Sequence, residues 1–258
     1  MHLIRFPRAC VVVGFSTGLM AVAATSPLAA QVSSSDINNA AAYGALLLTP
    51  PGAVAPIATS TILDQRQQGV VFAIRYGYVP TNGAVGFNNL GATAVLPVTP
   101  EATVSLTGGT TIPTCSSNTV GCSPGLMLGV GGDMRLAALG TAPATRITVS
   151  VNGELGYGKP RNVDHEFSGM VGLPIALLFN GDPTQGLRIV PWITPAFGFG
   201  NEQISSGAPS ASGQRAMIGG GIALTNGLSN IGASLGVQRI IITNGKTMVG
   251  LSITLGGR

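Results

Sequence analysis

Apolar and polar side chains alternate with a period of two along most of this chain. Between residues 146 and 157, for example, Ile147 and Val149 alternate with Thr148 and Ser150. Successive side chains of a β-strand point to opposite faces, whereas a helix repeats its apolar positions every three to four residues. The pattern therefore predicts strands that have one bulky apolar face and one small or polar face.

Ten segments share this pattern, near 68–79, 86–97, 102–113, 125–138, 146–157, 169–180, 187–200, 215–225, 229–241 and 247–256. Each is about as long as the roughly 9–11 residues that a tilted strand needs to cross a bilayer. We expect ten strands, with eight or twelve as alternatives. Residues 31–67 form a lead-in segment before them, which could be a short helix, a periplasmic or lumen-filling segment, or two extra strands.

Charged residues are scarce, and this scarcity limits the fold class. They make up 9% of the chain, against about 25% in an ordinary soluble domain. The longest apolar stretch beyond the first thirty residues, 170–179, contains Gly172 and Pro174 and is too short for a spanning helix. A closed barrel is the other structure that satisfies its backbone in a bilayer. The sequence thus predicts an all-β, antiparallel transmembrane β-barrel over residues 68–258.

The first thirty residues have the order of a secretory signal peptide. Arg5 and Arg8 precede an apolar run over 9–24, and small residues follow up to Ala30. This order of basic, apolar and small-residue regions is typical of a segment that is removed on export. We expect cleavage near Ala30 and localisation in a bacterial outer membrane. The chain has no basic run, so nucleic acid is not expected as a partner.

Cys115 and Cys122 lie in a polar, turn-rich stretch and follow the predicted signal peptide. Two cysteines in a short loop of an exported protein predict a local disulfide. On the chain-entropy model, closing so short a loop would stabilise it by about 2–3 kcal/mol. No histidine or acidic residue is close by in the sequence, so we expect no metal there.

The predicted connections are of two kinds. Short turns are expected at 98–101, 140–144, 181–186 and 226–228, whereas longer loops are expected at the cysteine stretch, 158–167 and 201–214. Short periplasmic turns and long outer loops are typical of outer-membrane barrels. On these features, residues 68–258 resemble small bacterial outer-membrane β-barrel proteins. The resemblance implies outer-membrane lipid and the barrel-assembly machinery as partners, although Gly256-Gly257-Arg258 departs from the terminal aromatic residue of that class.

Seven charged residues are predicted to face the lumen by the alternation: Arg75, Asp133, Arg135, Arg146, Glu154, Arg188 and Arg215. Charges at membrane depth are costly unless they are paired or wet. They therefore indicate either an interior network of ion pairs or a narrow aqueous path for small ions or solutes. Trp192 is expected on the same inner face, while Tyr76, Tyr78 and Tyr157 are expected in an outer interfacial girdle.

A catalytic arrangement is not evident in the sequence. His165, the one histidine beyond the predicted signal peptide, lies between Asp164 and Glu166 in a predicted outer loop. Adjacent side chains diverge in an extended segment, and three such residues in one loop are a weak metal signal. We therefore expect that the protein is not an enzyme and that it binds no metal and no cofactor. The predicted function is a structural or surface-interaction role, and the alternative is a narrow passive channel with weak anion preference.

Overall fold

The computed structural model describes residues 69–80, 86–99, 101–114, 124–140, 145–159, 163–180, 186–204, 211–226, 231–241 and 247–256. Their regular elements are strands: β1 (Val71–Pro80), β2 (Gly86–Thr99), β3 (Ala102–Thr114), β4 (Gly125–Leu139), β5 (Thr145–Lys159), β6 (Val163–Gly172), β7 (Ile175–Asn180), β8 (Leu187–Ile204), β9 (Ala211–Asn226), β10 (Ile231–Ile240) and β11 (Thr247–Gly256). Among these residues no helix has the length and apolarity that a membrane crossing requires. The predicted signal peptide and the lead-in segment 31–67 lie outside the described residues.

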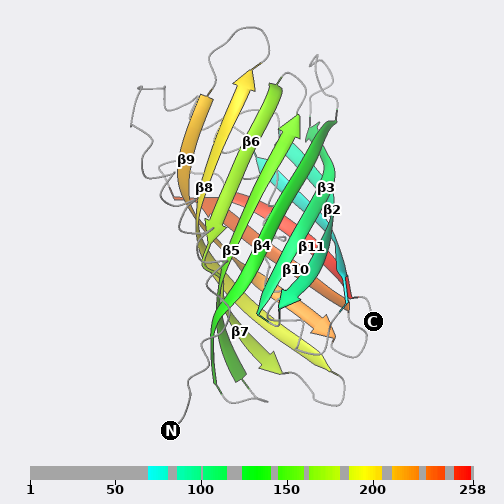
Figure 1. Ribbon diagram of the computed structural model, residues 1–258, viewed down its shortest axis with the longest axis vertical. Helices are drawn as coiled ribbons and strands as arrows, with labels where there is room; N and C mark the ends of the chain where they lie inside the picture. The colour runs from blue at the N-terminus through cyan, green and yellow to red at the C-terminus, as the bar shows by residue number, and fades with distance from the viewer. Residues whose placement is uncertain are drawn as a thin grey trace. The chain divides into compact units, whose positions relative to one another are not determined.

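The strands form one closed antiparallel barrel (Figure 1). Neighbours in the sequence pair with each other from β1 to β6 and from β7 to β11, and β1 pairs with β11 to close the sheet. Both β6 and β7 pair with β5 on one side and β8 on the other, so they occupy one position in the wall. The barrel therefore has ten strand positions, which confirms the predicted number. Closure leaves no unpaired sheet edge.

β6 and β7 are separated only by Leu173 and Pro174, and the register runs on unchanged across them. The amide of Ser150 donates to the carbonyl of Pro174 at 2.9 Å, and that of Leu173 donates to the carbonyl of Pro195 at 2.9 Å. A hydrogen-bonded pair of residues in an antiparallel sheet normally exchanges two backbone hydrogen bonds. Proline has no amide hydrogen, so Pro174 and Pro195 cannot donate the second bond of their pairs. The predicted strand 169–180 is thus one strand whose hydrogen-bond ladder is interrupted by two prolines.

The two faces of the wall differ as the alternation predicts. Exposed and buried residues alternate along the whole of β10 and almost the whole of β11. The outer face carries large exposed side chains, such as Phe72 (57% exposed) and Leu106 (55%). The inner face carries buried polar residues, such as Thr93 and Thr194. The medium that touches the bulky residues therefore lies outside the barrel, where it is lipid.

Two predicted loops are shorter in the structure than the sequence indicated. β5 continues to Lys159 and β6 begins at Val163, so most of the predicted loop 158–167 is strand. β8 likewise continues to Ile204 and β9 begins at Ala211, which shortens the predicted loop 201–214. We call this end of the barrel, where β1 ends, the loop end. The opposite end, where β1 begins, is the turn end.

Candidate functional site

The lumen is the candidate site, because the predicted charged residues lie on its wall. Arg75 and Asp133 are buried, with 8% and 5% of their surface exposed. The other five predicted residues are partly buried: Arg135, Arg146, Glu154, Arg188 and Arg215. Each of them except Asp133 has an exposed apolar residue next to it in its strand. Whether they serve an ion path stays a prediction.

One ion pair crosses the lumen. Arg75 Nη1 of β1 lies 3.9 Å from Glu154 Oε2 of β5, and both side chains are about nine-tenths buried. Three strands, β2 to β4, separate β1 from β5 along the wall, so the two side chains reach each other through the interior. Arg75 Nη1 and Glu154 Oε1 have no hydrogen-bond partner among the described residues. Such a pair costs desolvation but holds the two walls together as long as both charges are present.

Glycines on β4 make room for Glu154. A Cβ added at Gly129 would lie 3.2 Å from Glu154 Oε1, and one added at Gly131 would lie 3.3 Å from Glu154 Cγ. A side chain at position 131 would also be crowded from β3, because the added Cβ would lie 2.9 Å from Ser105 Oγ. The glycine-rich stretch of β4 therefore serves close packing inside the barrel.

Trp192 fills the part of the lumen beside β8 and β9. It is 5% exposed and lies on β8 facing β9. A Cβ added at Gly221 would lie 2.9 Å from Trp192 Cζ2, whereas one at Gly219 would lie at an ordinary 3.6 Å from Trp192 Cζ3. The indole thus packs against a strip of bare backbone, and the lumen is narrowed at this level.

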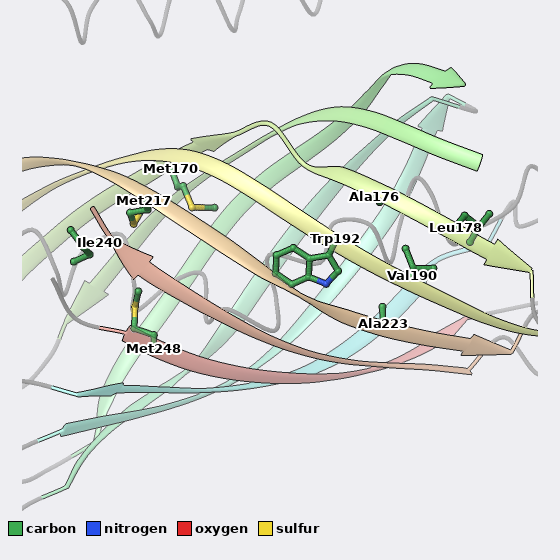
Figure 2. Close-up of a cluster of buried hydrophobic side chains, with 9 residues drawn as sticks. All are labelled: Met170, Ala176, Leu178, Val190, Trp192, Met217, Ala223, Ile240 and Met248. Carbon is green, nitrogen blue, oxygen red and sulfur yellow. The ribbon is translucent and has the colours of Figure 1, made fainter. Parts of the chain in front are cut away.

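A cluster of buried apolar side chains also lies inside the barrel (Figure 2). Its members come from the wall between β6 and β11: Met170, Ala176, Leu178, Val190, Trp192, Met217, Ala223, Ile240 and Met248. Toward the loop end, Gln238 joins them and is 1% exposed. Its Nε2 lies 3.5 Å from Met170 Sδ and 3.5 Å from Met217 Sδ. Sequence reasoning missed this contact because the three residues are far apart in the chain.

The turn end holds a second ion pair. Arg135 Nη2 lies 3.8 Å from Glu101 Oε1, and the Arg135 amide donates to the Glu101 carbonyl at 2.8 Å. Glu101 follows β2 in the shortest connection of the barrel and is half exposed. The sequence interpretation did not include Glu101, because only the pairing of β3 with β4 brings Arg135 beside it.

Asp164, His165 and Glu166 lie in β6 and not in a loop, which corrects the prediction. The pairing of β6 with β8 places His165 opposite Gln203 and Glu166 opposite Glu202. Within the described part of the chain, no group of three histidine, cysteine or acidic residues is arranged to hold a metal. Cys115 and Cys122 lie outside the described residues, so their disulfide stays a prediction.

These features together define the class of protein. The wall is closed, all its strands are antiparallel, its outer face is bulky and apolar, and its inner face is small, polar and charged. An apolar exterior of this kind is stable only against hydrocarbon, and a closed barrel leaves no unpaired backbone there. The protein is a small β-barrel of the bacterial outer membrane.

Comparison with known proteins agrees with this class and goes no further. No family model and no curated protein matches the chain. Among solved structures, LpxR from Salmonella typhimurium has a TM-score of 0.47 at 10% identity, over 74% of this chain and 85% of that one. The outer membrane protease OmpT from Escherichia coli has a TM-score of 0.32 at 6% identity, over 73% of this chain and 94% of that one. Likenesses of this size transfer no substrate or activity.

The comparisons correct one expectation from the sequence. The structures similar to this chain include that protease and the outer membrane enzyme PagL, which has a TM-score of 0.32 at 14% identity over 72% of this chain and 99% of that one. They also include the KdgM porin. The expectation that the protein is not an enzyme was wrong as a conclusion from the fold, because barrels of this class include enzymes as well as porins.

Proposed function

We propose that the protein is an outer-membrane barrel with a sealed lumen, whose role is structural or carried by surface interactions of its loop end. The proposal rests on one observation: side chains of strands that are not neighbours in the wall meet inside. Arg75 of β1 reaches Glu154 of β5, and Gln238 of β10 reaches Met170 of β6. An eight-stranded barrel is just filled by side chains, whereas barrels with aqueous channels have about 16–18 strands. Ten strands with large inner residues belong near the filled limit.

Planar-bilayer recording tests the sealed lumen. The purified protein should insert without steady conductance, with heat-modifiable migration on an unheated gel as the check of folding. A variant that combines Met170→Ala, Met217→Ala and Trp192→Ala removes bulk from the wall and should conduct. Conductance of this variant would show that the method detects an open barrel of this kind, so that the absence of conductance in the wild type reports a closed lumen. Steady conductance from the wild type would overturn the proposal.

The surface role is tested at the predicted disulfide. Cys115 and Cys122 lie in the sequence between β3 and β4, and β3 ends and β4 begins at the loop end. A membrane-impermeant maleimide added to whole cells should label the protein only after reduction. Labelling without reduction would contradict the disulfide, and failure to label reduced cells would contradict exposure of this end at the surface.

A narrow channel with weak anion preference is the second candidate. It is favoured by the charges on the inner wall, since five of the seven predicted residues are arginines. If the lumen conducts, the variant Arg75→Glu with Arg135→Glu should invert the preference between chloride and potassium. Unchanged selectivity in that variant would eliminate this candidate.

A further inference from the structure

The methionines of the barrel have an uneven distribution. Four are almost fully buried on the inner wall, with exposed fractions of 0–1%: Met127, Met170, Met217 and Met248. The large hydrophobic residues exposed on the outer face include leucine, isoleucine, valine, phenylalanine and tyrosine, and none of them is methionine. The large exposed residues of the described barrel are thus branched or aromatic, and its four most deeply buried thioethers lie inside.

Two of these thioethers converge on a single atom. Gln238 Nε2 lies 3.5 Å from the Sδ atoms of both Met170 and Met217, which come from β6 and β9. The amide is buried, and its Oε1 has no hydrogen-bond partner among the described residues. A half-turn of the amide brings this oxygen to the position of Nε2. The oxygen would then lie about 3.5 Å from each sulfur, so two sulfurs and one oxygen would be close enough to share one small ion between them.

The charged groups beside this place cancel each other, so an ion would be held by its donor atoms. Glu154 lies directly opposite Met170 in the pairing of β5 with β6, and its Oε1 has no hydrogen-bond partner among the described residues. Met248 lies opposite Gln238 in the pairing of β10 with β11 and offers a third sulfur nearby. The nearby Arg75 carries the opposing charge, but it is already paired with Glu154.

We propose that Met170, Met217 and Gln238 form a binding site for a soft monovalent cation, Cu(I) or Ag(I), inside the lumen. Thioethers are soft ligands and select Cu(I) over hard cations such as Mg²⁺ or Ca²⁺. The two sulfurs are the principal ligands, and the Gln238 oxygen completes the set.

Packing alone is the competing explanation, because methionine is flexible and fills irregular gaps. Leucine has nearly the same volume, so a Met→Leu change retains packing and removes the sulfur. The two explanations therefore separate cleanly: packing predicts no ion binding in the wild type, whereas the proposed site predicts binding that depends on two particular sulfurs.

The experiment uses the full barrel refolded in detergent micelles, with Ag(I) as the probe and Cu(I) in a second titration against a chromogenic chelator. One ion should bind per barrel. Met170→Leu and Met217→Leu should each weaken the affinity about 10-fold or more. Removing a residue that only orients a metal ligand already costs about 10-fold, and these two residues are the ligands themselves. Met127→Leu is the matched control, since Met127 is equally buried but packs against Gly91 and Gly109 of β2 and β3.

A second measurement uses the wild type alone. With methyl-labelled methionine, the signals of Met170 and Met217 should shift at one equivalent of Ag(I), while that of Met134, which lies on the outer side of β4, should not. Absence of Ag(I) binding, binding unchanged by Met170→Leu and Met217→Leu, or a shift limited to other methionines would each overturn the proposal.

Discussion

The two halves of the lumen wall are built differently. Along β1–β5 the buried inner residues are mostly polar or charged: Arg75, Asn89, Thr93, Thr103, Thr107, Thr111, Asp133, Thr148, Ser150 and Asn152. Along β6–β11 the inner wall carries the whole apolar cluster, from Met170 to Met248. The ion pair between Arg75 and Glu154 therefore joins strands of the first half across the lumen, whereas apolar packing dominates the second half, which also holds buried polar residues such as Ser234. A barrel interior can combine both in a single ring of strands.

The largest effect is expected from breaking the ion pair of the polar half. Arg75→Leu leaves Glu154 buried without its partner and should lower the free energy of unfolding by about 3–5 kcal/mol. Urea unfolding in micelles, followed by the fluorescence of Trp192, measures it, since Trp192 is the single tryptophan of the chain. The double variant Arg75→Leu with Glu154→Leu should recover most of the loss. Additive losses in the double variant would mean that the two residues do not interact.

A smaller effect is expected from crowding the packed half. A Cβ at Gly221 would meet the backbone at the Leu235 carbonyl and at Gly236 Cα, so Gly221→Ala should destabilise the barrel by about 1–3 kcal/mol. Gly219→Ala is the matched control, because its Cβ makes only ordinary contact with the same indole. The same unfolding assay compares the two. Equal losses would show that the close approach at Gly221 does not limit packing.

The smallest effect is expected at the turn end of the polar half. Glu101 is half exposed, so its ion pair with Arg135 is well screened. Glu101→Gln should cost about 0–1 kcal/mol, and the loss should disappear at high salt. The cost of Arg75→Leu should change little with salt, because that pair is buried. A salt-dependent loss in Arg75→Leu would contradict the contrast between the two pairs.

The sequence predicted the strands of the wall better than the contacts that their side chains make inside the lumen. The alternation over 146–157 matched β5 and assigned its faces, because the two-residue period is set by backbone geometry alone. The loop predicted at 158–167 was wrong, since polar residues at a rim carry no apolar alternation even when they form strand. The sequence predicted seven charges on the inner face, but it did not predict a partner for any of them. Arg75 and Glu154 meet only through the registers of the four strand pairs that connect β1 to β5 along the wall, and no local pattern encodes those registers.

The interruption between β6 and β7 has a consequence for how the wall opens. At Ser150–Pro174 and Leu173–Pro195, each pair is joined by one hydrogen bond where two are usual. The amides of Ser150 and Leu173 should therefore exchange with deuterium faster than their strand neighbours at equal depth. If the barrel separates transiently at either of these two strand interfaces, the proline there lowers by one the number of hydrogen bonds that must break.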